Sequence, residues 1–328
     1  NYTLTVTTQG NDASSLTVAI NNIPVSADVY SGGVIGYCEK SSKLLIENCR
    51  NAGNMIKRSD DKEVSLYSYL CSAEVLSPTA IRSDESVNLH FVGGLMSVNL
   101  VNQEIRHCSN TGSLSGYSGI GGIVGLNVGK IDNCNLSEHF GNVSLDYLGG
   151  IAGINLGRIE NCSTAAQKTI SGNNNIGGIV GWNLPTGKLS SCASSANINA
   201  SGSYVGGVAG RNRGTLELTT DTDSTKRTIS GTIGVGGVVG YNEAGGRLQP
   251  VTQTGNEVIA VGSGVTVSGN QSIGGIVGVN EGTLGMNTTS YLTCQAKRVK
   301  AAMGDVGGIV GRNSGDIYKA INRSDSVT

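Results

Sequence analysis

Residues 121–134 read Gly-Gly-Ile-Val-Gly-Leu-Asn-Val-Gly-Lys-Ile-Asp-Asn-Cys, and residues 149–162 repeat the phrase as Gly-Gly-Ile-Ala-Gly-Ile-Asn-Leu-Gly-Arg-Ile-Glu-Asn-Cys. The opening glycine pair, followed by two apolar residues, occurs nine times, at residues 32–35, 93–96, 121–124, 149–152, 177–180, 206–209, 236–239, 274–277 and 307–310. Successive copies begin 61, 28, 28, 28, 29, 30, 38 and 33 residues apart. This spacing indicates an internal repeat of about 28 residues with insertions, and it predicts a solenoid.

Each unit holds three short runs with the period-two pattern of β-strands, separated by Asn and Gly residues. The run that precedes the glycine pair is clearest at residues 169–172, 228–231 and 266–269. No part of the unit has the pattern of a helix. We therefore predict an all-β, right-handed parallel β-helix of about 28 residues and three short strands per coil, with roughly nine or more coils stacked about 4.8 Å apart.

The composition fits a narrow core and excludes several classes of protein. The 328 residues include 50 Gly but only 2 Phe and 1 Trp, so Ile, Val, Leu and Ala must fill the interior. The formal net charge is −1 and 14% of the residues are charged, which argues against a nucleic-acid or anionic-membrane surface. There is no run of about 18 apolar residues, so we expect no transmembrane segment.

Two regions depart from the repeat. Residues 1–30 are predicted to form N-terminal strands or a preceding coil, and residues 31–328 form the β-helix repeat domain. Within that domain, an insertion at about 51–91 is either an excursion from the rod or a degenerate coil, and a smaller insertion lies at about 243–272. The chain begins at Asn1 and shows no signal peptide, so we expect a mature or excised piece of a larger protein.

Asn recurs six residues after the first glycine of each pair, in every unit except the first, which has Cys38. The members of this column are Asn99, Asn127, Asn155, Asn183, Asn212, Asn242, Asn280 and Asn313. Stacked Asn side chains can bond to the equivalent side chain above and below, and Asn tolerates the left-handed conformation of a corner. The column therefore predicts a structural ladder with left-handed Asn residues at one corner of each coil.

Most of the eight cysteines also fall into one column. Its members are Cys49, Cys108, Cys134, Cys162 and Cys192. Stacked residues with parallel side chains are poorly oriented for disulfides, so we predict a buried ladder of free thiols. There is no Cys-x-x-Cys pair and the histidines are only His90, His107 and His139, so we predict no metal site and no cofactor. Cys38, Cys71 and Cys294 lie outside the column, and their pairing stays open.

Carboxylates are the natural candidates for catalysis on a β-helix. Asp132 and Glu160 occupy equivalent positions of adjacent coils, and Lys130 and Arg158 flank them in the same way. An enzyme would use such a pair as acid and base. The alternative is a solvated face on which the four side chains neutralise one another. We favour the alternative because these residues follow the repeat, and we predict no catalytic residue.

The column directly before the Asn varies freely and is the candidate contact surface. It contains Tyr37, Val98, Leu126, Ile154, Trp182, Arg211, Tyr241, Val279 and Arg312. Trp182, Arg211 and Tyr241 on successive coils would form a stacked aromatic and cationic strip that could bind a sugar, a peptide or another rod. The alternative is a partly covered surface column. The candidate binding residues are therefore Tyr37, Trp182, Arg211, Tyr241 and Arg312.

The strand around the glycine pair allows two shapes. In residues 120–126 both alternating sets contain aliphatic side chains, so either the strand bends at the glycines or both of its faces are covered. In the second case, an outer apolar stripe would mark an interaction surface. That stripe would consist of Val124, Ala152, Val180, Ala209, Val239 and Val277.

The phrase at residues 121–134 and 149–162 resembles the GLUG-type repeat of large surface proteins from Gram-positive and gut bacteria. These include adhesin-like proteins and the non-catalytic stalks of immunoglobulin A-specific metallopeptidases. The resemblance covers roughly residues 93–318 and implies an extracellular setting, at the bacterial cell surface or attached to the cell wall. No His-Glu-x-x-His occurs in this chain, so peptidase activity is not carried over. The family commonly has Ser or a small residue where this chain has its Cys column.

These observations favour a non-catalytic structural or adhesive module, a β-helical stalk or fibre that presents a surface to a host glycan, a host protein or like subunits end to end. The alternative is a polysaccharide lyase or hydrolase of the β-helix type. A spike or ice-binding surface is less favoured because no aligned Thr-x-Thr column runs through the coils. Open sheet edges at uncapped ends predict self-association.

Overall fold

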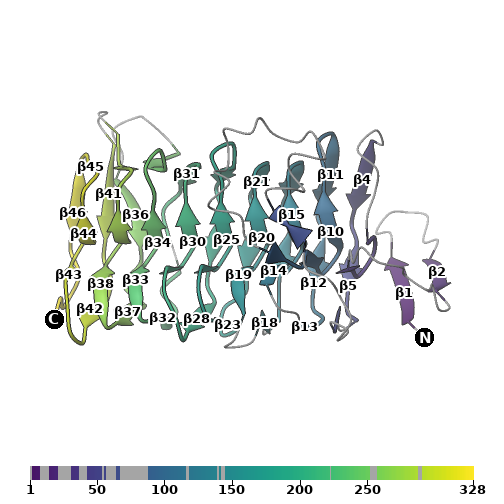
Figure 1. Cartoon of the computed structure of the whole chain (residues 1–328), viewed down its shortest axis with the longest axis horizontal. Coiled ribbons are helices and arrows are strands. Elements are labelled where there is room, and N and C mark those ends of the chain that lie inside the picture. Colours follow the sequence, from purple (N-terminus) through teal and green to yellow (C-terminus); the bar gives the residue numbers. More distant parts are fainter. Residues whose placement is uncertain are drawn as a thin grey trace.

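The structure, a computed structural model, is an all-β parallel solenoid whose coils stack along one long axis (Figure 1). It describes residues 2–7, 15–20, 31–36, 43–53, 55–56, 64–66, 88–115, 118–138, 140–141, 145–221, 223–251, 257–286 and 290–328. Tyr37, Cys38, Cys71 and His139 lie outside the described residues. The predicted fold class is confirmed.

Three long parallel sheets run the length of the rod, and in each of them every strand pairs with its equivalent one coil away. The glycine sheet ends at the glycine pairs and contains β3 (Ser31–Gly32), β9 (Val92–Gly93), β14 (Ser118–Gly121), β19 (Asp146–Gly149), β24 (Ile176–Gly177), β29 (Val205–Gly206), β33 (Ile233–Gly236), β38 (Gln271–Gly274) and β43 (Val306–Gly307). The asparagine sheet contains β10 (Met96–Asn99), β15 (Val124–Asn127), β20 (Ala152–Asn155), β25 (Val180–Asn183), β30 (Ala209–Asn212), β34 (Val239–Asn242), β39 (Val277–Asn280) and β44 (Val310–Asn313). The charged sheet contains β4 (Leu44–Glu47), β11 (Gln103–Arg106), β16 (Lys130–Asp132), β21 (Arg158–Glu160), β26 (Lys188–Ser190), β31 (Thr215–Leu218), β35 (Arg247–Pro250), β40 (Thr283–Leu284) and β45 (Asp316–Ile317).

Shorter parallel sheets close the coils. The cysteine sheet, which follows the Cys column, contains β5 (Arg50–Asn51), β12 (Ser109–Asn110), β17 (Asn135–Leu136), β22 (Ser163–Thr164) and β27 (Ala193–Ser194). The lower sheet, at the bottom of Figure 1, contains β18 (Phe140–Gly141), β23 (Thr169–Gly172), β28 (Asn197–Ala200), β32 (Arg227–Ser230), β37 (Val265–Gly269) and β42 (Arg298–Ala301). Two small sheets remain, one of β6 (Met55–Ile56) and β13 (Leu114–Ser115), and one of β36 (Glu257–Val261), β41 (Tyr291–Cys294) and β46 (Ala320–Asn322).

The solenoid has about seven turns, slightly fewer than the nine or more predicted. The glycine and charged sheets contain nine strands each, and the asparagine sheet contains eight. The coils between β14 and β28 hold five short strands each, where three were predicted. Sharp bends divide the predicted runs, so one run of the sequence becomes two strands in two sheets.

Single left-handed residues make two of these bends. One lies directly before the Cys column, where Asn133, Asn161 and their equivalents have φ between 50° and 54°. The other lies two residues before the glycine pair, where φ is between 56° at Tyr147 and 76° at Gly119. The prediction of left-handed residues in the Asn column is wrong, because no described member of that column has a positive φ. Those Asn residues end extended strands instead.

The glycine pair is required by close packing of the backbone. A Cβ on Gly177 would lie 2.0 Å from the carbonyl oxygen of Val180 in the same bend. A Cβ on Gly178 would lie 2.1 Å from the carbonyl oxygen of Gly207, the equivalent residue of the next coil. Neither contact is possible for a real side chain, so the pair fixes both the bend and the close approach of neighbouring coils.

The strand bends at the glycines, which decides between the two shapes that the sequence allowed. β14 ends at Gly121, and β15 begins at Val124 in a different sheet. Val124, Ala152, Val180 and their equivalents therefore point into the core and are fully buried. They do not form an outer apolar stripe.

Two regions depart from the parallel sheets. β1 (Tyr2–Thr7) and β2 (Ser15–Ile20) pair antiparallel with each other, which makes residues 1–30 a hairpin in their described part and not a coil. Within the insertion at 51–91, β6 pairs parallel with β13, whereas β7 (Val64–Ser65) and β8 (Asn88–Leu89) pair antiparallel with each other. No helix among the described residues has the length and hydropathy to cross a membrane.

Candidate functional site

The Asn column forms a continuous ladder of side-chain hydrogen bonds, as predicted. Each Nδ2 donates to the Oδ1 of the next coil, from Asn99 to Asn313, at distances between 2.7 and 2.9 Å. The members from Asn99 to Asn280 are fully buried. Nδ2 also donates to a nearby backbone carbonyl, such as that of Gly157 from Asn155 at 3.2 Å. The buried amides between the two ends of the ladder therefore hold coils together and are enclosed by protein.

The Cys column is a set of free thiols inside the rod. Cys108, Cys134, Cys162 and Cys192 are buried and unpaired in disulfides. Each thiol donates to the carbonyl oxygen two residues earlier, as Cys162 does to Glu160 at 3.1 Å. Burial raises the pKa of the Cys162 thiol, so it stays protonated and keeps this bond.

Cys294 resembles the column thiols in its surroundings. It is a free, fully buried thiol, and burial raises its pKa. A Cβ on Gly275 would lie 2.5 Å from its Sγ, so Cys294 packs against the second glycine of a pair. Among the described residues, no group of three or more His, Cys, Asp or Glu side chains could hold a metal ion.

The carboxylates of the charged sheet are paired with cations. Lys130 Nζ lies 3.2 Å from Asp132, 3.3 Å from Glu104 and 3.7 Å from Glu160. Arg158 Nη2 lies 2.5 Å from Glu160. Burial opposes ionisation of Asp132, but hydrogen bonds from Asn161 and Lys130 outweigh it and hold its pKa below the usual value. A general acid requires the opposite shift, so the geometry favours a solvated ionic face.

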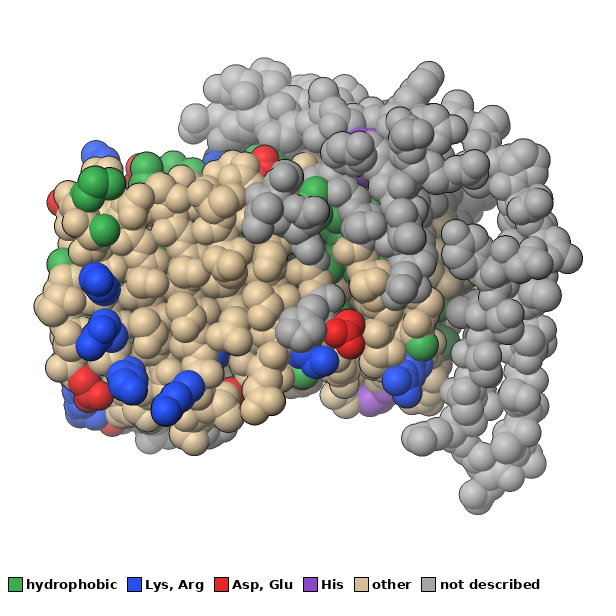
Figure 2. Space-filling model, turned by 90° about the horizontal axis from the view of Figure 1, so that it is seen from below, with side chains coloured by type: hydrophobic (Ala, Val, Ile, Leu, Met, Phe, Trp, Pro, Cys, Tyr) green, Lys and Arg blue, Asp and Glu red, His purple; other side chains and the backbone are tan. Residues whose placement is uncertain are grey.

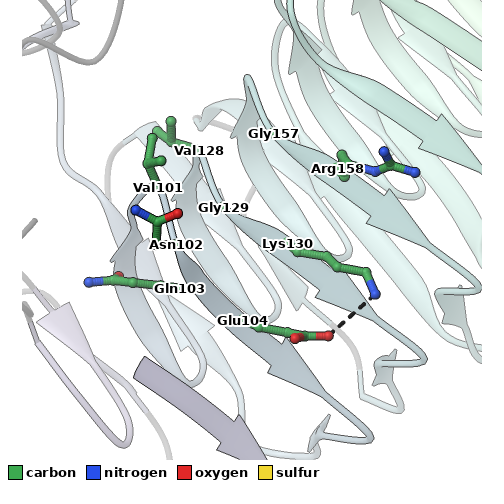
Figure 3. Close-up of a pocket in the computed structure, with 9 residues that line it drawn as sticks. All are labelled: Val101, Asn102, Gln103, Glu104, Val128, Gly129, Lys130, Gly157 and Arg158. Carbon is green, nitrogen blue, oxygen red and sulfur yellow. Dashed lines mark hydrogen bonds and ion pairs between the residues drawn. The ribbon is translucent and has the colours of Figure 1, made fainter. Parts of the chain in front are cut away.

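A shallow hollow of about 340 Å³ lies beside these ion pairs (Figure 3). Lys130 and Glu104 point toward each other along it, while Arg158 extends away. Its lining is Val101, Asn102, Gln103, Glu104, Val128, Gly129, Lys130, Gly157 and Arg158. Asp132 and Glu160 are not part of the lining, so the hollow does not bring the candidate carboxylate pair to one ligand.

The column before the Asn stacks as predicted but is not an open strip. Trp182, Arg211 and Tyr241 are in register on β25, β30 and β34. The guanidinium carbon of Arg211 lies 4.6 Å from the Trp182 ring centroid and 5.7 Å from that of Tyr241. Trp182, however, is fully buried. Its prediction as an accessible contact is therefore wrong, whereas Arg312 at the end of the column is exposed and Tyr37 is outside the described residues.

Trp182 is buried because the outside of the asparagine sheet is covered over several coils. Val98, Leu126, Ile154 and Trp182 belong to a second apolar cluster, separate from the core. Leu66, which follows β7 of the insertion, is fully buried in the same cluster. We call this cluster the covered flank. Leu66 of the insertion therefore lies in the same apolar cluster as Trp182, whose own ring contacts Tyr147, Arg211 and Glu243.

A buried carboxylate that the sequence analysis missed ends the covered flank. Glu243 has only 5% of its side chain exposed. Its Oε1 accepts hydrogen bonds of 2.9 Å from Trp182 Nε1 and Arg211 Nε, and its Oε2 lies 2.8 Å from Arg213 Nη2. The sequence does carry a pattern that could have predicted this site. The residue directly after the column Asn changes from Leu184 to Arg213 and then to Glu243 on successive coils. A cation next to an anion in a stacked column predicts an ion pair.

Beyond Glu243 the flank opens to solvent. Tyr204 and Tyr241 pack with ring centroids 5.0 Å apart and are partly exposed. Burial and a hydrogen bond to Glu281 raise the pKa of Tyr241. The structure thus leaves Tyr241 and Arg312 as the predicted binding residues with accessible surface, while Arg211 is mostly enclosed by Trp182, Tyr241 and Glu243.

Comparison with known proteins adds no assignment. No family model, no curated protein and no solved structure matches this chain.

Proposed function

We propose that this chain is a non-catalytic structural and adhesive module, a β-helical stalk that presents its sides to a glycan, a protein or a like subunit. The observation that carries the proposal is the Asn ladder, which links coil to coil through seven side-chain hydrogen bonds from Asn99 to Asn313, six of them buried. In a rod of this kind each coil contacts only its neighbours, and the ladder bonds successive coils in the same way, as a stalk requires.

The state of the polar side chains supports a non-catalytic role. The carboxylates of the charged sheet are neutralised by Lys130 and Arg158, and Glu243 accepts bonds from two arginines and an indole. Catalytic carboxylates are usually held with one member protonated or with a shifted, raised pKa. Asp132 has a lowered pKa.

The proposed setting is the bacterial cell surface, outside the cell. It rests on the resemblance of residues 93–318 to GLUG-type repeats of surface proteins. The buried position of the free thiols is compatible with an oxidising compartment, because a thiol that is 1% exposed, as Cys134 is, meets no oxidant in the folded rod.

The first test separates adhesion from catalysis. The chain would be incubated with a panel of acidic and neutral polysaccharides while reducing ends and unsaturated products are measured, and its retention on the same polysaccharides and on host matrix proteins would be recorded. We expect retention without product. Turnover that disappears in the double variant Asp132→Asn, Glu160→Gln would overturn the proposal in favour of a β-helix lyase or hydrolase.

A further inference from the structure

The lower sheet carries a pattern of small uncharged polar residues on its outer side. Outward positions on β23, β32 and β37 are Thr and Ser, and those on β28 are Asn and Asn, as in Thr169-x-Ser171 and Asn197-x-Asn199. The residues between them, such as Ile170 and Ile198, are buried in the core. We call the outward positions of these four strands the polar face.

The polar face is a regular array. Between β23 and β28, Thr169 pairs with Asn197 and Ser171 with Asn199. Between β32 and β37, Thr228 pairs with Thr266. Parallel pairing places equivalent residues about 4.8 Å apart along the rod, and alternate residues of one strand about 6.6 Å apart across it. Four coils therefore present two columns of hydroxyl or amide groups over roughly 14 Å.

The polar face has defined ends. On the C-terminal side the two columns continue into Arg298 and Lys300 of β42, which are exposed. On the other side Gly141 of β18 pairs with Ser171 and offers no side chain. Seen from below, the surface over β23, β28, β32 and β37 is a broad area in which polar side chains and backbone predominate, with Lys and Arg at its border (Figure 2).

Hydrogen bonds between coils hold several of these side chains in place. Asn197 Oδ1 accepts the backbone N–H of Thr228 at 2.8 Å, and Ser230 Oγ lies 3.2 Å from Asn199 Oδ1. Side chains that are already fixed lose less entropy when a ligand binds. The face is thus preorganised, although it is too open to enclose a small molecule.

We propose that the polar face binds a neutral, linear polysaccharide that lies along the rod axis. This assignment rests on the proposed adhesive function and names its ligand class. Hydroxyls and carboxamides both donate and accept hydrogen bonds, so they match the hydroxyl groups of a sugar chain. A polymer with its own repeat can contact several coils at once, which turns weak single contacts into useful avidity. The outward positions of the four strands carry no charge, since Arg227 of β32 is buried, and this favours a neutral chain over an anionic one.

An ordered water lattice is the other ligand with a repeating array of hydroxyl groups. The face is less suited to it because Asn197 and Asn199 interrupt the Thr and Ser columns in the second of four coils. A lattice that repeats at every step requires the same side chain at every step. A sugar chain tolerates the change, because an amide offers the same donor and acceptor roles as a hydroxyl.

The test variant is Thr266→Arg with Ser268→Lys. It copies onto β37 the residues that the neighbouring strand β42 already carries at the paired positions Arg298 and Lys300. The matched control is Thr215→Lys with Thr283→Lys, which places two charges on the charged sheet, in the column of Lys188 and Arg247. Equal thermal transitions of the three proteins would show that folding is unaffected.

The measurement is co-sedimentation with microcrystalline cellulose, chitin and an insoluble β-1,3-glucan. We expect the unaltered chain to be retained by at least one of them, and Thr266→Arg with Ser268→Lys to weaken that retention about tenfold or more, which corresponds to losing one or two good hydrogen bonds. The control variant stays within about twofold of the unaltered chain, the range left when no hydrogen bond is lost.

Three results would overturn the inference. Absence of retention on all three polysaccharides would do so while leaving the stalk proposal standing, because adhesion to protein is still measurable. Equal retention of the test variant would place glycan binding on another face. Thermal hysteresis of freezing that is present in the unaltered chain and lost in the test variant would assign the face to ice.

Discussion

The two neighbouring columns of the asparagine sheet differ in what they contact. The Asn column faces its own copies, and its members from Asn99 to Asn280 are the same residue in the same buried place. The column one residue earlier faces outward and runs from Val98 through Trp182 to Arg312. An amide side chain has both a donor and an acceptor, so each Asn can bond to the identical Asn of the next coil. The inward Asn column therefore keeps one residue type, whereas the residue type in the outward column changes with what covers each coil.

The largest effect is expected where a uniform inner column is interrupted. Asn183→Ala removes two ladder hydrogen bonds and the bond that Nδ2 donates to Gly187. It leaves the buried Oδ1 of Asn212 without its donor and one N–H of Asn155 without its acceptor, at a cost of about 3–5 kcal/mol of unfolding free energy. Chemical denaturation followed by circular dichroism measures it. Asn313→Ala, at the exposed end of the ladder, costs less than about 1 kcal/mol. Equal losses for the two variants would contradict a cooperative ladder.

The next effect comes from the outer column where it is covered. Glu243→Gln keeps the size of the side chain but removes the charge between Arg211 and Arg213, and we expect a loss of about 2–3 kcal/mol, because two mostly buried cations lose their anion. Trp182 is the only Trp of the chain, so its fluorescence reports on this place directly. Glu281→Gln, in the exposed position of the next coil, is the control. If both variants have the same denaturation midpoint and the same Trp182 fluorescence, the buried ion pairs of Glu243 do not contribute to stability.

A smaller, pH-dependent effect tests the inner thiols. The pKa of Cys162 is raised in the folded state, so the thiol holds its proton more tightly there than in the unfolded chain. The contribution of Cys162 to stability is then complete below the unfolded pKa and falls as the pH rises above it, by about 1.4 kcal/mol per pH unit. Denaturation midpoints between pH 7 and 10 measure this slope. Cys162→Ser should reduce the decrease of stability with pH. An unchanged pH dependence would show that the Cys162 thiol does not cause it.

The smallest effect is expected on the exposed ionic face. Asp132→Asn with Glu160→Gln should change stability by less than about 1 kcal/mol, because exposed ion pairs contribute little. Added salt should further reduce the difference, since it screens exposed charges. A loss as large as that of Asn183→Ala would mean that outer and inner columns are equally important.

Much of the fold could be predicted from the sequence, because residues one repeat apart in a solenoid lie next to each other in neighbouring coils. The nine glycine pairs give nine strands of one sheet, and the Asn and Cys columns stack in the predicted register. The corners were harder to predict. The residues that adopt left-handed angles vary in type, from Asn133 to His107 and Tyr147, so they are not visible as a column of one residue.

The covered flank could not be predicted from the repeat. Leu66 lies in the same apolar cluster as Trp182 although it is more than a hundred residues earlier in the chain, and Tyr147 and Glu243, which contact Trp182, stand at positions that vary between units. The polar face was visible in part, since the runs at 169–172, 228–231 and 266–269 alternate polar and apolar residues. No continuous Thr column is visible in the sequence, because Asn197 and Asn199 stand at positions that only strand pairing shows to be equivalent to the Thr and Ser positions.

The Asn ladder has a direction. Every amide donates toward the C-terminal end, so Asn99 Oδ1 has no donor among the described residues while Asn313 offers its Nδ2 at the opposite end of the rod. The dipoles of these side-chain amides therefore point the same way along the rod, so the ladder distinguishes one direction of the solenoid axis from the other in addition to the direction of the chain.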